Sequence, residues 1–257
     1  MKKILGILFL IATHSLFGQN IATIEKQLNT AFQKIDYWSS EGRSLESSSD
    51  SLYAANTKFE KLLLKYTSSN PQTLSHHFNS LRKNRLTIAT SEDGKFRIYS
   101  WDTWTGGTMH FFKNVYQYKT GDQVHSKTIA PDAEGDPKSF YYQINDIVSQ
   151  NKKYYLTQST SIFSTGLSAH YVKIFSIEDG QLNDAAQLIK TQTGIRNQLQ
   201  YEVDLTASAN RNNEIRNYNI EYDKKNKIIS IPLILDDYKI TSKKIRYQFK
   251  GKYFEKI

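Results

Sequence analysis

The chain has 257 residues, with 34 lysines and arginines against 25 aspartates and glutamates, and it contains no cysteine. The absence of cysteine excludes disulfides, thiolate metal ligands, thiol nucleophiles and a lipid attached to a cleaved amino-terminal cysteine. The formal net charge of +9 comes without a recognisable nucleic-acid-binding motif, so nucleic acid is not an expected partner. The length allows one large domain, or a small domain joined to a large one.

Residues 1–18 have the layout of a secretory signal peptide. Lys2 and Lys3 precede an apolar run at residues 4–12. The small residue Gly18 follows, as expected at the end of a signal peptide. We therefore expect cleavage before Gln19 and a mature protein that is periplasmic or secreted. Because the apolar run is far shorter than the roughly 20 residues that a spanning helix needs, no membrane span is expected.

Residues 19–85 are predicted to form a helical subdomain, because their apolar residues recur every three or four positions. A first helix is expected from residue 21 to about 38, and a second from Ser49 or Asp50 to the region of Pro71. A third, shorter helix is expected before Lys83. The residues expected to face inward are Ile24, Leu28, Ala31, Phe32 and Ile35 in the first helix, Leu52, Ala55, Phe59, Leu62, Leu63 and Tyr66 in the second, and Leu74, His77, Phe78 and Leu81 in the third.

Residues 86–257 show a different period, in which apolar residues alternate with polar ones as they do in strands. Turn signals such as "EDG", "TGG", "DKKNK" and "KGK" separate the runs. This part is predicted to be a β-meander domain. The whole chain is then an α+β fold, mainly β, with the helical subdomain packed on an antiparallel sheet. Strands are expected near residues 86–91, 95–104, 108–119, 140–149, 153–163, 169–177, 199–206, 213–223, 226–235, 240–249 and 252–256.

Three arrangements of this meander use the same turn and strand signals. Groups of about four strands, at residues 140–188 and 199–249, would be the blades of a propeller-like fold. A sandwich and an irregular barrel fit the same pattern. The sequence does not distinguish between these three architectures.

The segment "SWDTWTGGTMHFF", residues 100–112, places aromatic residues around two glycines. A two-residue turn at Gly106 and Gly107 would pair Trp101 with Phe112 and give the hairpin two aromatic faces. In one interpretation, one face packs in the sheet core, together with Trp104, and the other packs under the helices. In the other interpretation, the second face is a platform for a sugar ring or another flat apolar ligand. The ligand-binding residues would then be Arg97, Tyr99, Trp101, His110 and Tyr116.

No catalytic motif is recognised in the chain, and we assign no catalytic residue. Ser168 and His170, in "GLSAH", lack the second glycine of a nucleophile elbow and the helix that follows it, so this segment is interpreted as a hairpin connection. An enzyme built on two carboxylates needs no motif, however. Hydrolysis is therefore kept as an alternative.

No metal and no cofactor are expected. His76 and His77 are neighbours on a predicted helix and point about 100° apart, which makes a poor chelate. Asp132, Glu134 and Asp136 lack the spacing of a calcium loop and are interpreted as a solvated acidic loop.

These observations predict an exported, soluble binding or interaction module of the cell envelope or exterior. Its partner is expected to be a glycan or another envelope protein. The alternative is a secreted hydrolase that acts on glycans. A cleft with two facing carboxylates would favour the hydrolase, whereas a shallow aromatic surface would favour the binding module.

Overall fold

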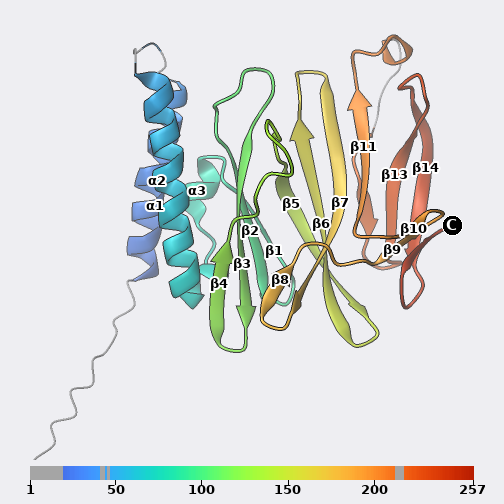
Figure 1. Cartoon of the computed structure of the whole chain (residues 1–257), viewed down its shortest axis with the longest axis horizontal. Coiled ribbons are helices and arrows are strands. Elements are labelled where there is room, and N and C mark those ends of the chain that lie inside the picture. Colours follow the sequence, from blue (N-terminus) through green and yellow to red (C-terminus); the bar gives the residue numbers. More distant parts are fainter. Residues whose placement is uncertain (1–19, 41–43, 45–46, 212–216) are drawn as a thin grey trace, which may run out of the picture.

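The computed structural model describes residues 20–40, 44, 47–211 and 217–257. A layer of helices covers one sheet, and two further sheets are stacked behind it (Figure 1). The fold is α+β and mainly β, as predicted, and the described sheets are open rather than closed into a barrel. The predicted signal peptide lies outside the described residues. No helix in the described part of the chain is both long enough and apolar enough to cross a membrane.

The two long helices agree closely with the predicted ones. They are α1, Ile21–Ser39, and α2, Ser48–Ser69. The side chain of Asn20 caps α1 by accepting a hydrogen bond of 2.9 Å from the backbone N–H of Ala22, which satisfies one of the free donors at the helix start. All five residues predicted to face inward from α1 are buried.

The predicted third helix is divided into two shorter elements, η2, Pro71–Leu74, and α3, Asn79–Lys83. Phe78 lies between them with a left-handed backbone φ of 51°. That conformation cannot continue a right-handed helix. His77, which was predicted to face inward, is exposed as a result, while Phe78 is buried.

The strands form three sheets of four, five and six members. The first sheet contains β1, Thr87–Thr90, β2, Phe96–Asp102, β3, Phe112–Thr120, and β4, Gln123–Lys127. The second contains β5, Phe140–Ser149, β6, Lys152–Ile162, β7, Leu167–Glu178, β8, Gln181–Asn183, and β11, Gln198–Asp204. The third contains β9, Ile189–Thr191, β10, Gly194–Arg196, β12, Glu221–Asp223, β13, Ile228–Ile234, β14, Ile240–Phe249, and β15, Phe254–Lys256.

The strand connections differ from a simple meander. β11 leaves its neighbours in the sequence and pairs with β7 in the second sheet, while β15 lies between β14 and β9 and is parallel to β9. The predicted blades at residues 140–188 and 199–249 are therefore wrong, because the second of them is divided between two sheets. Of the three predicted architectures, the sandwich is nearest, with three sheets stacked face to face (Figure 1).

Four short strands, β4, β8, β9 and β10, were not predicted. The last three have three residues each, too few to show an alternating pattern. The predicted strand at residues 213–223 is observed as Glu221–Asp223, and its segment 212–216 lies outside the described residues.

Three apolar cores separate the layers. One lies between the helices and the first sheet, one between the first and second sheets, and one between the second and third sheets. Neighbouring residues of one strand therefore enter different cores. Tyr155 of β6 faces the first sheet and Leu156 faces the third, and Ile98 and Tyr99 of β2 are divided in the same way. This double burial explains why so many strands are apolar on both faces.

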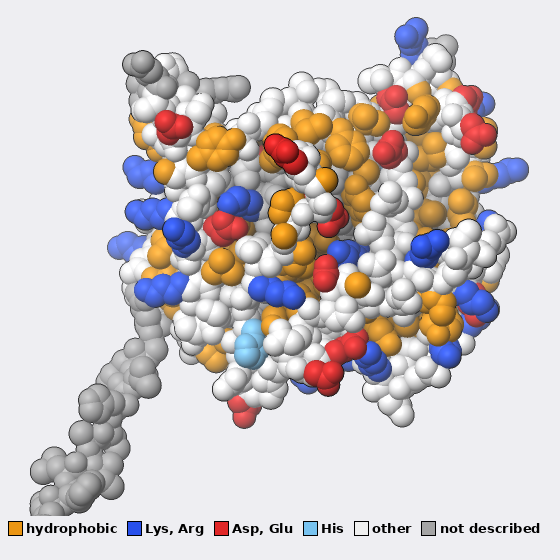
Figure 2. All heavy atoms as spheres, viewed as in Figure 1, with side chains coloured by type: hydrophobic (Ala, Val, Ile, Leu, Met, Phe, Trp, Pro, Cys, Tyr) orange, Lys and Arg blue, Asp and Glu red, His pale blue; other side chains and the backbone are white. Residues whose placement is uncertain are grey.

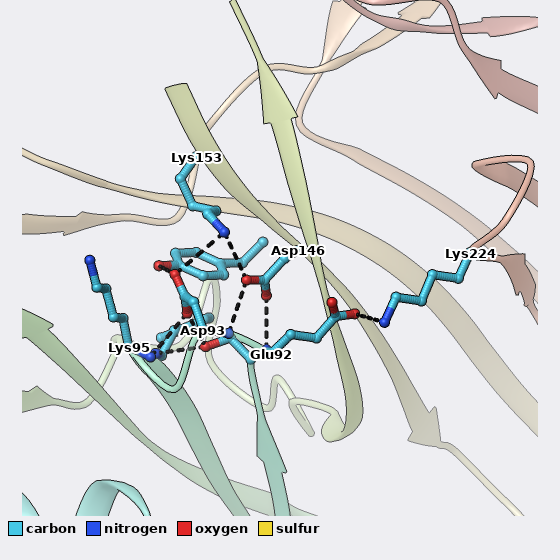
Figure 3. Close-up of polar contacts among 9 residues, drawn as sticks. Glu92, Asp93, Lys95, Asp146, Lys153 and Lys224 are labelled. Atoms are coloured by element: carbon cyan, nitrogen blue, oxygen red, sulfur yellow. Dashed lines mark hydrogen bonds and ion pairs between the residues drawn. The ribbon is translucent and has the colours of Figure 1, made fainter. Parts of the chain in front are cut away.

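A polar cluster joins all three sheets at the turn between β1 and β2 (Figure 3). Asp146 of β5 accepts hydrogen bonds from the backbone N–H groups of Glu92 and Asp93 at 3.0 and 3.1 Å. Lys153 of β6 lies 3.0 Å from the Asp146 carboxylate. The Glu92 carboxylate pairs with Lys224, which precedes β13, at 2.7 Å. The cluster thus fixes the position of the first sheet relative to the other two.

The surface charge is unevenly distributed. Figure 2 shows basic side chains gathered over the helices at the left of the view, and acidic and basic side chains interspersed elsewhere. Opposite charges therefore share the face seen in this view.

Candidate functional site

The predicted hairpin at residues 100–112 forms with a different register. Asp102 pairs with Phe112, and Trp101 pairs with Lys113 rather than with Phe112. The turn is longer than two residues, because the backbone N–H of Thr103 donates to the carbonyl oxygen of Phe111 at 2.8 Å and closes a loop at residues 103–111. A Cβ atom at Gly106 would collide with the backbone of Met109 inside this loop, so the loop requires glycine there.

This shift of one residue exchanges the two faces of β3, because successive side chains of a strand point to opposite sides. Tyr99 and Trp101 face the helices, and their neighbour on β3 is Val115. Tyr116 lies on the other face, in the core shared with the second sheet. The five residues predicted to bind a ligand therefore do not share one surface.

Four of those five residues are buried. Trp101 is 1% exposed, and Arg97, Tyr99 and Tyr116 are 4% exposed or less. The packing interpretation is confirmed, since one face of β2 and β3 lies under the helices and the other lies against the second sheet. The structure does not contain the predicted open platform.

Arg97 and Tyr99 belong to an internal polar network that holds the segment after α2. The Arg97 guanidinium donates to the carbonyl oxygens of Thr73 and His76 at 2.8 and 2.6 Å. The Tyr99 hydroxyl lies 2.9 Å from the carbonyl oxygen of Thr73 and 2.8 Å from Gln117 Oε1. Burial raises the pKa of Tyr99 to about 12. Both side chains thus support the fold.

Two of the predicted residues, Trp101 and His110, do meet at a cavity between α1 and the ends of β2 and β6, which we call the aromatic pocket. Its volume is about 270 Å³, near the lower end of the roughly 300–1,000 Å³ usual for ligand sites. Asp36 and Arg85 are exposed at its rim. Its aromatic lining residues are Phe32, Trp101, Trp104, Phe112 and Phe140, and its charged or titratable ones are Asp36, Arg85, Asp102 and His110.

Asp102, the last residue of β2, organises the pocket. Its Oδ2 lies 2.5 Å from Nδ1 of His110, and its Oδ1 accepts a hydrogen bond of 2.8 Å from the backbone N–H of Trp104. The His110 ring is stacked against Phe112, with 6.3 Å between centroids, and meets the Trp104 indole edge to face at 6.0 Å. One carboxylate therefore positions two rings of the pocket.

Trp104 was predicted in the sheet core, and this prediction is wrong. β2 ends at Asp102, and Trp104 follows in the loop with a left-handed φ of 57°. Its side chain is 37% exposed, and the Arg85 guanidinium lies over the indole at 5.9 Å from the ring centre. A left-handed backbone is rare for a large L-residue, and the hydrogen bond to Asp102 helps to hold it. The indole is thereby kept at the mouth of the pocket.

Ser168 and His170 lie in β7 itself rather than in a hairpin connection. The Ser168 hydroxyl is 3.1 Å from His170 Nε2, and the Thr160 hydroxyl is 3.3 Å from Nδ1. Burial lowers the pKa of His170 to about 4, which makes the imidazole a weak base. A hydroxyl also stands where a catalytic triad has its carboxylate. This pair therefore lacks the features of an activated nucleophile.

Among the residues that the structure describes, no group of three or more His, Asp or Glu side chains could hold a metal ion. His76 pairs instead with Glu25, at 2.6 Å. In the acidic loop, the Asp136 carboxylate accepts hydrogen bonds from the backbone N–H groups of Asp132 and Lys138 at 3.0 and 2.8 Å. The Asp136 carboxylate thus stabilises the turns of its own loop.

A comparison with protein-family models gave no match to the chain, and a comparison with curated proteins gave none either.

Proposed function

We propose that the protein is an exported binding module that holds a flat, partly apolar group, such as a sugar ring, in the aromatic pocket. The observation that carries this proposal is the half-exposed Trp104 indole, which stands at a cavity lined by four further aromatic residues. Aromatic faces bury the apolar C–H surface of a sugar ring, while polar groups at the rim bind its hydroxyls. Asp36 and Arg85 supply such groups.

The contacts of Asp102 support binding because they fix the pocket before a ligand enters. His110 and Trp104 are both held by this carboxylate. A site whose side chains are already ordered loses less conformational freedom on binding. A pocket for one ring then needs little rearrangement.

The alternative, a glycan hydrolase, would need two carboxyl groups available to the substrate. The aromatic pocket is lined by two carboxylates, Asp36 and Asp102. Both oxygens of Asp102, however, are already engaged with His110 and Trp104. Asp36 is then left as the carboxylate that could act on a substrate in this pocket, so the geometry favours binding over hydrolysis.

Export is part of the proposal and rests on the first eighteen residues of the sequence. Protein purified from its native host should begin at or near Gln19, as measured by mass spectrometry. A correctly targeted protein that keeps Met1 would contradict export without affecting the proposal for the pocket.

Saturation-transfer NMR with single-ring probes tests the pocket directly. The probes are methyl β-glucoside, methyl α-mannoside and N-acetylglucosamine. We expect transfer to at least one of them in the wild-type protein and its loss in Trp104→Ala. The matched control is Tyr53→Ala, since Tyr53 is an aromatic residue on α2 that is 61% exposed and does not line the pocket. Equal transfer in wild type and Trp104→Ala, or no transfer at all, would overturn the proposal.

A further inference from the structure

A second and larger cavity lies on the face of the second sheet that is turned toward the third sheet. Its volume is about 600 Å³, which falls within the roughly 300–1,000 Å³ usual for ligand sites. We call it the neutral groove. Tyr218, which precedes β12, forms part of its wall. Its polar floor residues, on β5, β6 and β7, are Tyr142, Gln143, Gln158, Thr160, Ser168 and His170.

The side-chain amide of Gln158 is the first indication that the groove binds a ligand. The side chain is 1% exposed and lines the groove, and its amide nitrogen has no hydrogen-bond partner among the described residues. A buried donor without a partner costs on the order of 1–3 kcal/mol and is uncommon in folded proteins. An acceptor atom of a ligand in the groove would satisfy this donor.

His170 gives the groove a second fixed polar group. Its ring is held between the hydroxyls of Ser168 and Thr160 and is stacked on Tyr201, with 5.2 Å between centroids and 9° between planes. Because burial lowers its pKa to about 4, the imidazole is uncharged at neutral pH. The ring therefore adds no charge to the site, and its two nitrogens hold the Ser168 and Thr160 hydroxyls in place at the groove.

The lining that the structure describes carries no charge, although charged residues make up 23% of the chain. Among the described residues, it contains amides, hydroxyls, one neutral imidazole, aromatic rings and aliphatic side chains, and no Asp, Glu, Lys or Arg. A charged ligand would lose its hydration here without meeting an opposite charge. A purely apolar ligand would leave the amide of Gln158 without an acceptor. The lining therefore suits an uncharged ligand that is rich in hydroxyl groups.

We infer that the neutral groove binds an uncharged oligosaccharide, with the Gln158 amide donating to one of its oxygens and the ring of Tyr218 packing against a sugar. This site is distinct from the aromatic pocket, although Phe140 and Ile162 line both cavities and show that the two adjoin. The inference does not require that the aromatic pocket bind a sugar.

The test uses calorimetric titration with neutral hexasaccharides, and cellohexaose, maltohexaose and laminarihexaose are the probes. Each probe is titrated into the wild type and into Trp104→Ala, and all groove variants are made in the Trp104→Ala background, so that the aromatic pocket does not contribute to their comparison. At least one probe should bind, and adding Gln158→Leu should weaken its binding about tenfold, the effect of one buried hydrogen bond. Tyr218→Ala, at the half-buried wall, should also weaken it. The acidic trisaccharide trigalacturonate should bind at least tenfold more weakly than the best neutral probe.

Asn145→Leu is the matched control. Asn145 is a second buried amide whose nitrogen lacks a partner in the part of the chain that the structure describes, and it does not line the groove. This variant should keep the affinity of its background.

The melting temperature of Gln158→Leu should equal that of its background or exceed it, because a leucine of similar volume removes an unpaired donor. A clear fall in the melting temperature would overturn the inference.

Three further outcomes would overturn the inference: no binding of any neutral hexasaccharide, equal binding by Gln158→Leu and its background, or preference for trigalacturonate. Hexasaccharide binding that is present in wild type and absent from Trp104→Ala would assign the ligand to the aromatic pocket alone. That result would support the proposed function while overturning the second site.

Discussion

The indole N–H of Trp101 donates a hydrogen bond of 3.0 Å to Oδ1 of Asn56, and this contact joins β2 to α2. The amide nitrogen of Asn56 donates in turn to the carbonyl oxygens of Leu52 and Thr103, at 3.0 and 2.9 Å. Phe59 of α2 packs edge to face on the same indole, with 5.1 Å between ring centroids. The helices and the first sheet therefore share one core. The predicted boundary near residue 85 marks a change of secondary structure, and the division into a helical subdomain and a β-meander domain stays a prediction.

Trp101→Ala should lower the free energy of unfolding by about 3–5 kcal/mol, because it leaves a large cavity and an unpaired Asn56 oxygen in this core. Trp104→Ala should change it by about 1 kcal/mol or less, because the Trp104 indole is partly exposed. Denaturant melts of the two variants beside the wild type measure both values. Similar losses at the two positions would contradict the packing described here.

Asp102→Ala should release both His110 and the backbone N–H of Trp104. The expected loss of stability is about 1–2 kcal/mol, since one partly buried carboxylate makes both contacts. Binding of single-ring probes should also weaken, because Trp104 is no longer held at the mouth of the pocket. Asp36→Ala, at the exposed rim, is the comparison, and its melting temperature should equal that of the wild type. An Asp102→Ala protein that binds the probes as tightly as wild type would show that the pocket does not depend on this carboxylate.

The sequence predicted well those parts of the fold in which one hydrophobic periodicity, helical or strand-like, continues over a long segment. The helix expected at residues 21–38 is observed at Ile21–Ser39, and the strand expected at 140–149 is observed at Phe140–Ser149. Layering could not be predicted, because strands buried on both faces have no polar side to mark the direction of the core. The hairpin register was wrong because Gly106 and Gly107 suggested a two-residue turn, whereas the Thr103 to Phe111 hydrogen bond closes a longer loop.

The aromatic pocket was predicted only in part. Trp101 and His110 were identified because their segment is rich in aromatic residues. Asp36 and Arg85 belong to other segments, and only the packing of the helices on the sheet brings them to the pocket. The proximity of Asp102 to His110, eight residues apart across a turn, was a signal available in the sequence. The neutral groove left no such signal, because the unpaired state of Gln158 depends on the tertiary packing that brings residues of β5, β6 and β7 together with Tyr218 around one cavity.

The cluster in Figure 3 predicts an acid-sensitive contribution from Asp93. Burial alone would raise its pKa, but hydrogen bonds from the backbone of Lys95 and the hydroxyl of Ser91, with the charge of Lys153, leave the pKa below the usual 3.8. A depressed carboxyl pKa stabilises the fold above pH 3.8 and loses that effect as the pH falls through the folded-state pKa. Asp93→Asn should therefore be less stable than wild type at pH 7, with a difference that shrinks below pH 4.

Urea melts between pH 7 and pH 3 measure this difference. Asp122→Asn is the matched control, because Asp122 is fully exposed and its contact with Lys119 is 4.0 Å long. Its stability should follow that of the wild type at every pH. A constant gap between wild type and Asp93→Asn down to pH 3 would show that the ionised form of Asp93 is not the stabilising one.

His170 predicts a second pH dependence, in a higher range. Its pKa falls from 6.5 to about 4 on folding because the imidazole is buried, so the unfolded chain takes up its proton first as the pH decreases. Stability is then fully present above pH 6.5 and decreases between about 6.5 and 4, by an upper limit of about 3.5 kcal/mol at roughly 1.4 kcal/mol for each unit of pKa difference. His170→Gln should remove this decrease in urea melts, whereas His77→Gln, at an exposed histidine, should retain it. If wild type and His170→Gln lose stability in parallel between pH 6.5 and 4, then folding does not lower the pKa of His170, and burial does not favour its neutral form.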